Sequence, residues 1–185
     1  MMNVKAISVN VGKALLVSAL FMFLSIVVSI VDGRDSAFGP LMISFIITLI
    51  FGGFPFIFVR KVQALSLNDG FLTIVLSWFL SFVFGMLPYV LWGGEFTLVN
   101  AWFESVSGYP TTGSTILNNI DEQPHGILFW RSITQWLGGL GIIVLFLAVM
   151  PTLNRNSNKV MMFSAEMSGI GVKKLHPKMM MTARK

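Results

Sequence analysis

Residues 100–117 read Asn-Ala-Trp-Phe-Glu-Ser-Val-Ser-Gly-Tyr-Pro-Thr-Thr-Gly-Ser-Thr-Ile-Leu, and this stretch decides the fold. It begins as a short apolar segment that carries one acid, Glu104, and it ends in a turn of small residues from Thr111 to Ser114. Long hydrophobic segments flank it on both sides. Backbone that is not helical persists at membrane depth only where protein covers it or where it lines a wet cavity. We therefore interpret the stretch as a re-entrant pore loop.

The composition is that of a polytopic membrane protein. Hydrophobic residues make up 55% of the 185 residues and charged residues only 11%, against roughly 25% charged residues in soluble domains. The net charge of +5 does not indicate nucleic acid, because the basic residues lie between and after the hydrophobic runs, where they set orientation. The chain has no cysteine, which excludes disulfides, thiolate metal sites and cysteine nucleophiles.

Hydrophobic runs divide the chain into predicted membrane segments. The run 14–31 has 18 uncharged residues, which at ~1.5 Å per residue nearly crosses a hydrocarbon layer of ~30 Å. The run 98–108 is too short to cross. We predict an all-α integral membrane protein with an N-terminal two-helix extension and one helix–pore-loop–helix repeat. The predicted parts are the extension 1–68 with spans 14–31 and 38–59; the repeat 69–150 with outer helix 71–92, pore helix 98–108, filter 109–114 and inner helix 125–150; and a basic cytoplasmic tail 151–185.

Local signals predict where these helices begin, bend and end. Asn68 or Asp69 is the expected cap of the outer helix. Gly85 and Pro88 predict a kink in it, and Pro151 is expected to end the inner helix. In the second span, the Gly52–Pro55 segment is expected to cause a kink or to allow a neighbouring helix to approach closely.

Charge asymmetry predicts the orientation. If the N-terminus is cytoplasmic and the number of crossings is even, the C-terminal tail is cytoplasmic too. In this orientation 11 of the 13 Lys and Arg residues face the cytoplasm, and six of the eight acids fall on the outer half. This bias favours cytoplasmic N- and C-termini and a loop that dips into the membrane from outside.

The loop has the features that a cation pathway requires. Successive carbonyls in a narrow turn replace the water around a cation without carboxylates at the constriction. Glycine is needed where a carbonyl must point inward from a backbone angle that side chains disfavour. The preceding helix directs its C-terminus, with ~−0.5 of a charge, at the ion path. A span, a short helix, a Thr-Thr-Gly-Ser turn and a second span together form a cation-pore module.

Several segments of the chain resemble the bacterial TrkH/KtrB potassium-uptake proteins of the Trk/Ktr/HKT superfamily, with the TrkH branch closer. The run 101–144 carries the most specific part of the resemblance. The similar segments are Asp69-Gly70-Phe71, Leu87-Pro88, Ala101-Trp102-Phe103-Glu104-Ser105, Thr111-Thr112-Gly113-Ser114-Thr115, Ile127-Leu128-Phe129-Trp130-Arg131, Gln135 to Val144, and the tail segments Ala165 to Pro177 and Thr182-Ala183.

The resemblance implies a two-helix extension followed by four pore repeats, of which this chain holds the first, as an N-terminal fragment. It implies that K⁺, the transported ion, is coordinated by the backbone carbonyls of Pro110, Thr111, Thr112 and Gly113. Members with glycine at the Gly113 position tend to select potassium, and members with serine there admit sodium. The chain departs from the family at Tyr109-Pro110, where Leu-Thr is more usual. The implied setting is the bacterial plasma (inner) membrane, and the implied partners are a second full-length chain, a cytosolic nucleotide-binding regulatory subunit of the TrkA/KtrA type, and the lipid bilayer, with no nucleic acid.

Four residues are predicted to support the pore: Glu104, Ser114, Arg131 and Gln135. Glu104 either attracts cations at the mouth or braces the loop by accepting hydrogen bonds. Arg131 either pairs with Glu104, Asp121 or Glu122, or extends to the outer interface. Gln135 either contacts the loop or packs between helices. The glycines at 138, 139 and 141 are expected to form a packing surface, with a gating hinge as the alternative.

Two functions of different classes fit these patterns. The first is potassium uptake through a carbonyl filter. The second is a non-conducting membrane interaction subunit, or a degenerate relic of such a transporter, in which 111–114 is an ordinary turn. The sequence contains no Gly-x-Ser-x-Gly motif, metal-binding histidine pair or P-loop, so we do not expect an enzyme.

Overall fold

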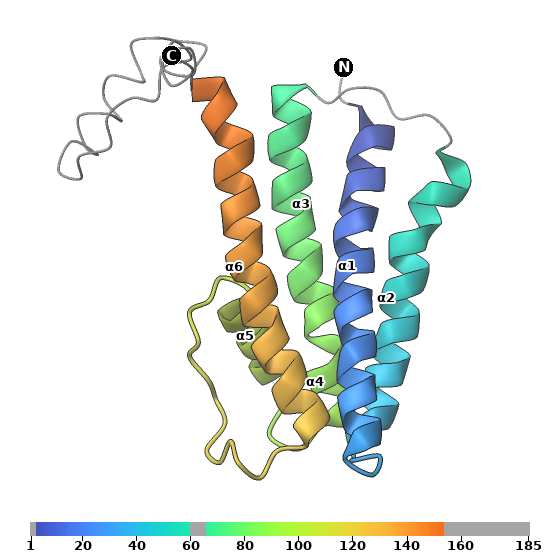
Figure 1. The fold of residues 1–185 in the computed structure, drawn as a ribbon, viewed down its shortest axis with the longest axis vertical. Coiled ribbons are helices and arrows are strands. Elements are labelled where there is room, and N and C mark those ends of the chain that lie inside the picture. Colours follow the sequence, from blue (N-terminus) through green and yellow to red (C-terminus); the bar gives the residue numbers. More distant parts are fainter. Residues whose placement is uncertain (1–2, 60–65, 154–185) are drawn as a thin grey trace, which may run out of the picture. The chain divides into compact units, whose positions relative to one another are not determined.

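The computed structural model describes residues 3–59 and 66–153, and within these ranges the chain is helical, with no strand. Residues 1–142 form one compact unit, and all packing described below lies within it. This architecture confirms the predicted all-α class. The helices are α1 (Val4–Val31), α2 (Phe38–Phe58), α3 (Leu67–Gly85), α4 (Leu87–Trp92), α5 (Leu98–Gly108) and α6 (His125–Leu153) (Figure 1).

Among the described residues, three segments are long and apolar enough to cross a membrane: α1, α2 and the stretch Asn68–Trp92, which contains most of α3 and all of α4. The helix α1 begins at Val4, well before the uncharged run that starts at residue 14. Large apolar side chains on these helices are exposed, including Ile50, Phe54 and Val75. Contiguous apolar surface of this kind is unfavourable in water and suits contact with lipid.

Helices α1 and α2 run side by side (Figure 1) and approach closely at two glycines. A Cβ atom at Gly12 would lie 2.6 Å from the Gly52 carbonyl oxygen, and one at Gly52 would lie 3.1 Å from the Leu15 Cβ. Small residues at such contacts allow the helix backbones to come together. The helix α2 continues through Pro55 to Phe58, so this segment allows a close approach and does not end the helix.

The cap of α3 differs from the predicted one. Ser66 is the N-cap residue, and its hydroxyl accepts a hydrogen bond from the Asp69 amide, while the Asp69 carboxylate accepts from the Ser66 amide. This reciprocal pair is a capping box, which satisfies two of the free amides at a helix start. The predicted cap, Asn68 or Asp69, lies two or three residues after the observed one, because the prediction considered only the residues next to the hydrophobic run. The Asp69 carboxylate also accepts from the Asn3 amide at 3.1 Å, which links the starts of α1 and α3.

The predicted kink is present as a break between α3 and α4. The helix α3 ends at Gly85, and α4 begins at Leu87 with Pro88 in its first turn. Proline has no amide hydrogen and its ring displaces the preceding turn, so carbonyls here lose helical partners. The Gly85 carbonyl accepts a hydrogen bond from the indole of Trp130 at 3.0 Å. The break therefore provides an acceptor for a side chain of α6.

The helix α6 is longer than predicted at its C-terminal end. It continues past Pro151 to Leu153. Pro151 therefore lies in the last turn of α6, two residues before its end. From residue 154 on, the basic tail predicted for 151–185 lies outside the described residues.

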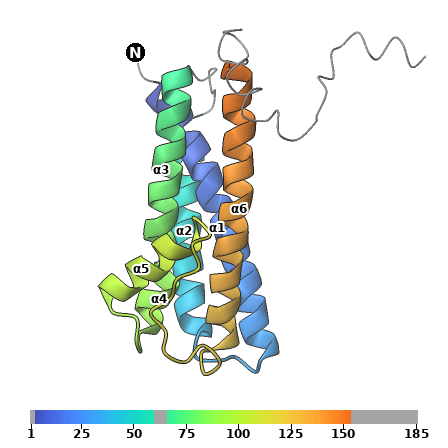
Figure 2. The ribbon, with the colours of Figure 1, turned by 90° about the vertical axis from the view of Figure 1, so that its left-hand side faces the viewer.

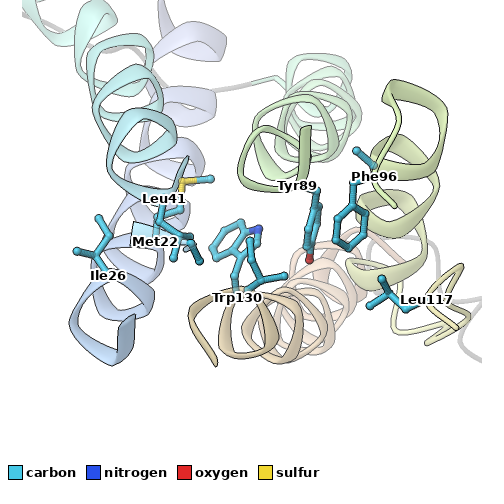
Figure 3. Packing of buried hydrophobic residues seen from close by; sticks show 10 residues of the cluster. Met22, Ile26, Leu41, Tyr89, Phe96, Leu117 and Trp130 are labelled. Atoms are coloured by element: carbon cyan, nitrogen blue, oxygen red, sulfur yellow. The ribbon is translucent and has the colours of Figure 1, made fainter. Parts of the chain in front are cut away.

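A buried core joins the N-terminal helix pair to the remaining helices of residues 1–142. Trp130 and Tyr89 are the largest fully buried side chains in the described part of the chain. Figure 3 shows Trp130 between Met22 and Leu41 on one side and Tyr89 on the other, with Phe96 and Leu117 beyond Tyr89. The start of α6 is thus held between the α1–α2 pair and the segment that carries α5.

Candidate cation pore loop

The short helix α5 directs the chain into the loop 109–114. Its N-cap is Thr97, whose hydroxyl accepts from the Asn100 amide at 3.3 Å. With 11 residues, it covers only ~16 Å at 1.5 Å per residue, about half of a hydrocarbon layer of ~30 Å. Figure 2 shows α5 beside α4, with the loop following it. The helix is followed by non-helical backbone at Thr112–Leu117.

The loop turns its amides back toward the end of α5. The Thr111 amide donates to the Gly108 carbonyl at 2.9 Å, and the amides of Thr112 and Gly113 donate to the Ser107 carbonyl at 3.0 and 3.3 Å. These bonds satisfy carbonyls that a helix C-terminus otherwise leaves free. Thr111 and Gly113 both have positive φ, 62° and 76°. Only Gly113 adopts this conformation without a steric cost.

Among the exposed residues of the loop, three carbonyls have no hydrogen-bond donor in the described part of the chain. Within the part of the chain that the structure describes, no hydrogen-bond donor lies on the carbonyl oxygens of Pro110, Thr111 or Thr112. The residues from Pro110 to Ser114 are exposed in this chain. The Gly113 carbonyl differs, because it accepts a hydrogen bond from Nη2 of Arg131 at 3.2 Å. Its oxygen therefore faces α6 in this chain.

Glu104 and Arg131 form a buried ion pair behind the loop. Glu104 is 2% exposed, and its Oε1 accepts from Nε of Arg131 at 2.5 Å. Its Oε2 accepts from the Thr115 hydroxyl at 3.0 Å and from the Ile116 amide at 3.2 Å. Of the alternatives left open by the sequence, this geometry corresponds to Glu104 as a brace and to Arg131 paired with Glu104.

The other two predicted support residues are Ser114, the last residue of the loop, and Gln135 of α6, which lies beside it. The Ser114 carbonyl accepts from the Ser107 hydroxyl at 2.6 Å, so the backbone of Ser114 makes the bond. A Cβ atom at Gly113 would lie 3.8 Å from Nε2 of Gln135, which places the Gln135 amide next to the loop.

The glycine cluster of α6 packs closely on the loop. A Cβ atom at Gly138 would lie only 1.4 Å from the Tyr109 carbonyl oxygen, an impossible contact. Nearby, a Cβ at Gly108 would lie 2.7 Å from the hydroxyl of Thr134, which is fully buried. At Gly138 the cluster is a packing surface.

Ser107 and Thr115 also hold the loop, although sequence reasoning assigned them no such role. Their hydroxyl groups could have been noted as unusual in a short membrane segment. Their partners, the Ser114 carbonyl and the Glu104 carboxylate, are brought close by folding, so the sequence pattern does not identify them.

The fold is that of a helical membrane protein in which a short helix and a loop are inserted between two longer helices. A family model for the TrkH cation transport proteins matches residues 40–182. The Trk system potassium uptake protein TrkH of Escherichia coli K12 is 35% identical over 188 aligned positions, which cover 99% of this chain and 38% of that protein. TrkI of Halomonas elongata is 40% identical over 141 positions, covering 75% of this chain and 28% of its own length.

A solved structure shows the same fold. The crystal structure of the potassium transporter TrkH from Vibrio parahaemolyticus matches with a TM-score of 0.76 at 35% identity, over 83% of this chain and 33% of that one. The chain therefore belongs to the TrkH cation transport protein family, and it spans less than two fifths of the length of the curated relatives it matches.

Proposed function

We propose that this chain takes part in potassium uptake across the bacterial plasma (inner) membrane, and that its 109–114 loop is one of four loops of a backbone-carbonyl selectivity filter. The observation that carries the proposal is the set of three loop carbonyls, at Pro110, Thr111 and Thr112, on which no donor lies in the described residues. A dehydrated K⁺ requires oxygens in place of its water, and carbonyls of a constrained turn supply them. Relatives from two organisms bear the name of potassium uptake proteins.

Gly113 completes the proposed set of ligands. Its carbonyl accepts one hydrogen bond from Arg131, but a carbonyl oxygen has two lone pairs. The second lone pair is free for an ion shared with the other loops. The Arg131 bond then fixes the direction of this carbonyl, while Glu104 neutralises the arginine charge that would otherwise repel K⁺.

The wider organisation is part of the same proposal. Residues 1–68 form an N-terminal extension, 69–150 a pore repeat, and 151–185 a connection on the cytoplasmic side, with both termini in the cytoplasm. The working protein is a homodimer of full-length chains with a cytosolic nucleotide-binding regulatory subunit of the TrkA/KtrA type. The resemblance to the TrkH/KtrB proteins implies the dimer and the regulatory subunit, and charge asymmetry favours the cytoplasmic termini.

The test is cation uptake by the product of the complete gene in cells that lack their own potassium-uptake systems. The unaltered protein should take up radioactive rubidium, a potassium substitute, in preference to sodium. Gly113→Ser should lower this preference because the side chain disfavours the φ of 76° and alters the carbonyl geometry.

The chain offers a matched control for backbone strain. Gly33 also has a positive φ, 79°, in the turn between α1 and α2, and a Cβ there would meet nothing within 4 Å. Gly33→Ser should therefore leave the ratio of rubidium to sodium uptake unchanged. The proposal is refuted if the unaltered protein takes up no rubidium, or if Gly113→Ser and Gly33→Ser give the same ratio as the unaltered protein.

A further inference from the structure

The Tyr109 side chain passes through a gap on α3 instead of facing the ion path. Tyr109 is the first residue after α5 and is 4% exposed. A Cβ atom at Gly85 would lie 2.6 Å from the Cε2 atom of Tyr109 and 3.2 Å from its hydroxyl. The ring also packs on Phe82, with 5.8 Å between ring centroids. Glycine at position 85 therefore makes the space that the tyrosine occupies.

Beyond this gap the tyrosine reaches the N-terminal helix. Its hydroxyl oxygen lies 3.4 Å from the Ser18 hydroxyl of α1, and Ser18 is 3% exposed. This separation is longer than the ~2.8 Å of a typical O–H···O bond. Both groups are nevertheless buried together, and buried hydroxyls are normally paired. In the described part of the chain, the hydroxyls of Ser18 and Tyr109 are hydrogen-bond partners of each other.

The backbone of Tyr109 is held from the opposite side. Its carbonyl oxygen occupies the space where Gly138 of α6 has no side chain. Tyr109 is therefore fixed by α3, α1 and α6 at once. The next residue is Pro110, whose φ is locked by its ring, so the placement of Tyr109 constrains where the backbone enters the segment that carries the free carbonyls.

We infer that Tyr109 is a positioning residue through which the N-terminal helix α1 sets the ion selectivity of the loop, by way of Ser18. The inference rests on the proposed function, because it assigns a new determinant to the same filter. It gives the two-helix extension a role in ion discrimination besides packing. It also gives a role to the Tyr109-Pro110 pair, where the sequence departs from the usual family pattern.

Removal of either hydroxyl tests the inference. The variants Tyr109→Phe and Ser18→Ala are made singly and together in the complete gene product. Each substitution removes one of the two hydroxyl groups and is compatible with the local backbone. Rubidium and sodium uptake are measured at equal membrane abundance, determined by immunoblot. Each single variant should lower the rubidium-to-sodium ratio by about threefold, the scale of one modest buried hydrogen bond. The double variant should lower it no further.

Two controls match the chemistry. Tyr89→Phe removes the hydroxyl of another buried tyrosine, one with no hydrogen-bond partner in the described residues. Ser25→Ala removes a buried hydroxyl of α1 that donates to the Phe21 carbonyl of its own helix at 3.0 Å. Both should keep the ratio of the unaltered protein. A general loss of stability would lower the abundance of the protein in the membrane. It would not make the rubidium-to-sodium ratio of the test variants differ from that of the controls.

The outcomes distinguish this inference from the proposed function. If Gly113→Ser lowers the ratio while Tyr109→Phe and Ser18→Ala leave it unchanged, the inference is wrong and the filter proposal stands. Fully additive effects of Tyr109→Phe and Ser18→Ala would also overturn it, because the two hydroxyls would then act separately. Absence of rubidium uptake by the unaltered protein would overturn both.

Discussion

Replacement of Glu104 by glutamine should destabilise the loop by about 3 kcal/mol. The carboxylate accepts three bonds, from Arg131, Thr115 and the Ile116 amide. Glutamine keeps one acceptor oxygen and turns an NH₂ group toward the other donors. If the oxygen faces Arg131, the Thr115 hydroxyl rotates to accept, but the Ile116 amide has no acceptor. Exchanging the charged acceptor of Arg131 for a neutral amide oxygen costs about 1.5 kcal/mol, and an unsatisfied buried amide costs about 1–3 kcal/mol.

The matched control is Glu95→Gln. Glu95 is exposed, and its carboxylate accepts from the amide and side chain of Asn118 at 3.3 and 3.4 Å. The chemical change is the same, but water satisfies whatever glutamine leaves unpaired. We expect an effect below about 0.5 kcal/mol, as for most exposed substitutions. The measurement is unfolding of the purified complete chain in mixed micelles with increasing SDS.

A double-mutant cycle isolates the ion pair. Arg131→Gln alone leaves Glu104, which is 1% exposed at its side chain, as an unpaired buried charge, so it should also be costly. The variant with both glutamines should be less destabilised than the sum of the single variants, by about 2 kcal/mol, a coupling typical of contacting residues. Additive effects, or a Glu104→Gln protein as stable as Glu95→Gln, would refute the assignment of Glu104 as the brace of the loop.

Two further substitutions probe how the loop and the outer turn are held. Gly138→Ala should displace the loop and abolish rubidium uptake, because the new Cβ would lie 1.4 Å from the Tyr109 carbonyl oxygen; such overpacking typically costs about 1–3 kcal/mol or more. Asp35→Asn should weaken the link between the α1–α2 turn and α6 by about 1–2 kcal/mol, measured as a lower SDS midpoint. The Asp35 carboxylate accepts from the Gly126 amide at 2.8 Å, and asparagine retains one of its two acceptor oxygens.

Each of these substitutions has a control in open surroundings. Gly53→Ala places a methyl group in α2 where nothing lies within 4 Å, so uptake should be retained. Asp121→Asn makes the charge change of Asp35→Asn at an exposed position. If Gly138→Ala transports as well as Gly53→Ala, the close packing of α6 on the loop is wrong. Equal midpoints for the two aspartate variants would exclude the Asp35 link.

The local sequence signals differ in how far they predicted the structure. Gly85 and Pro88 predicted a kink, and the structure has a break between α3 and α4 at this place, because proline removes a helical hydrogen bond. The cap of α3 was predicted incorrectly, since Ser66 rather than Asn68 or Asp69 begins the helix. Several adjacent residues there can cap, and their residue types alone do not choose among them. Pro151 was expected to end α6, but the helix continues to Leu153.

The amino-acid sequence by itself determined the helical membrane class. Long uncharged runs must satisfy their own backbone in hydrocarbon, and only helices do so within one segment. The composition and the runs therefore leave little choice, whatever the neighbouring segments do. The sequence also limited the acidic and basic residues near the loop to a few, among them Glu104 and Arg131.

Only the tertiary structure decided how those residues are paired. Arg131 had three possible acidic partners in sequence, and folding places it on Glu104 and on the Gly113 carbonyl. The contact of Tyr109 with Ser18 joins residues separated by 91 positions. Such pairings depend on the crossing of helices at glycines, where the absence of a side chain sets a distance that no local pattern encodes.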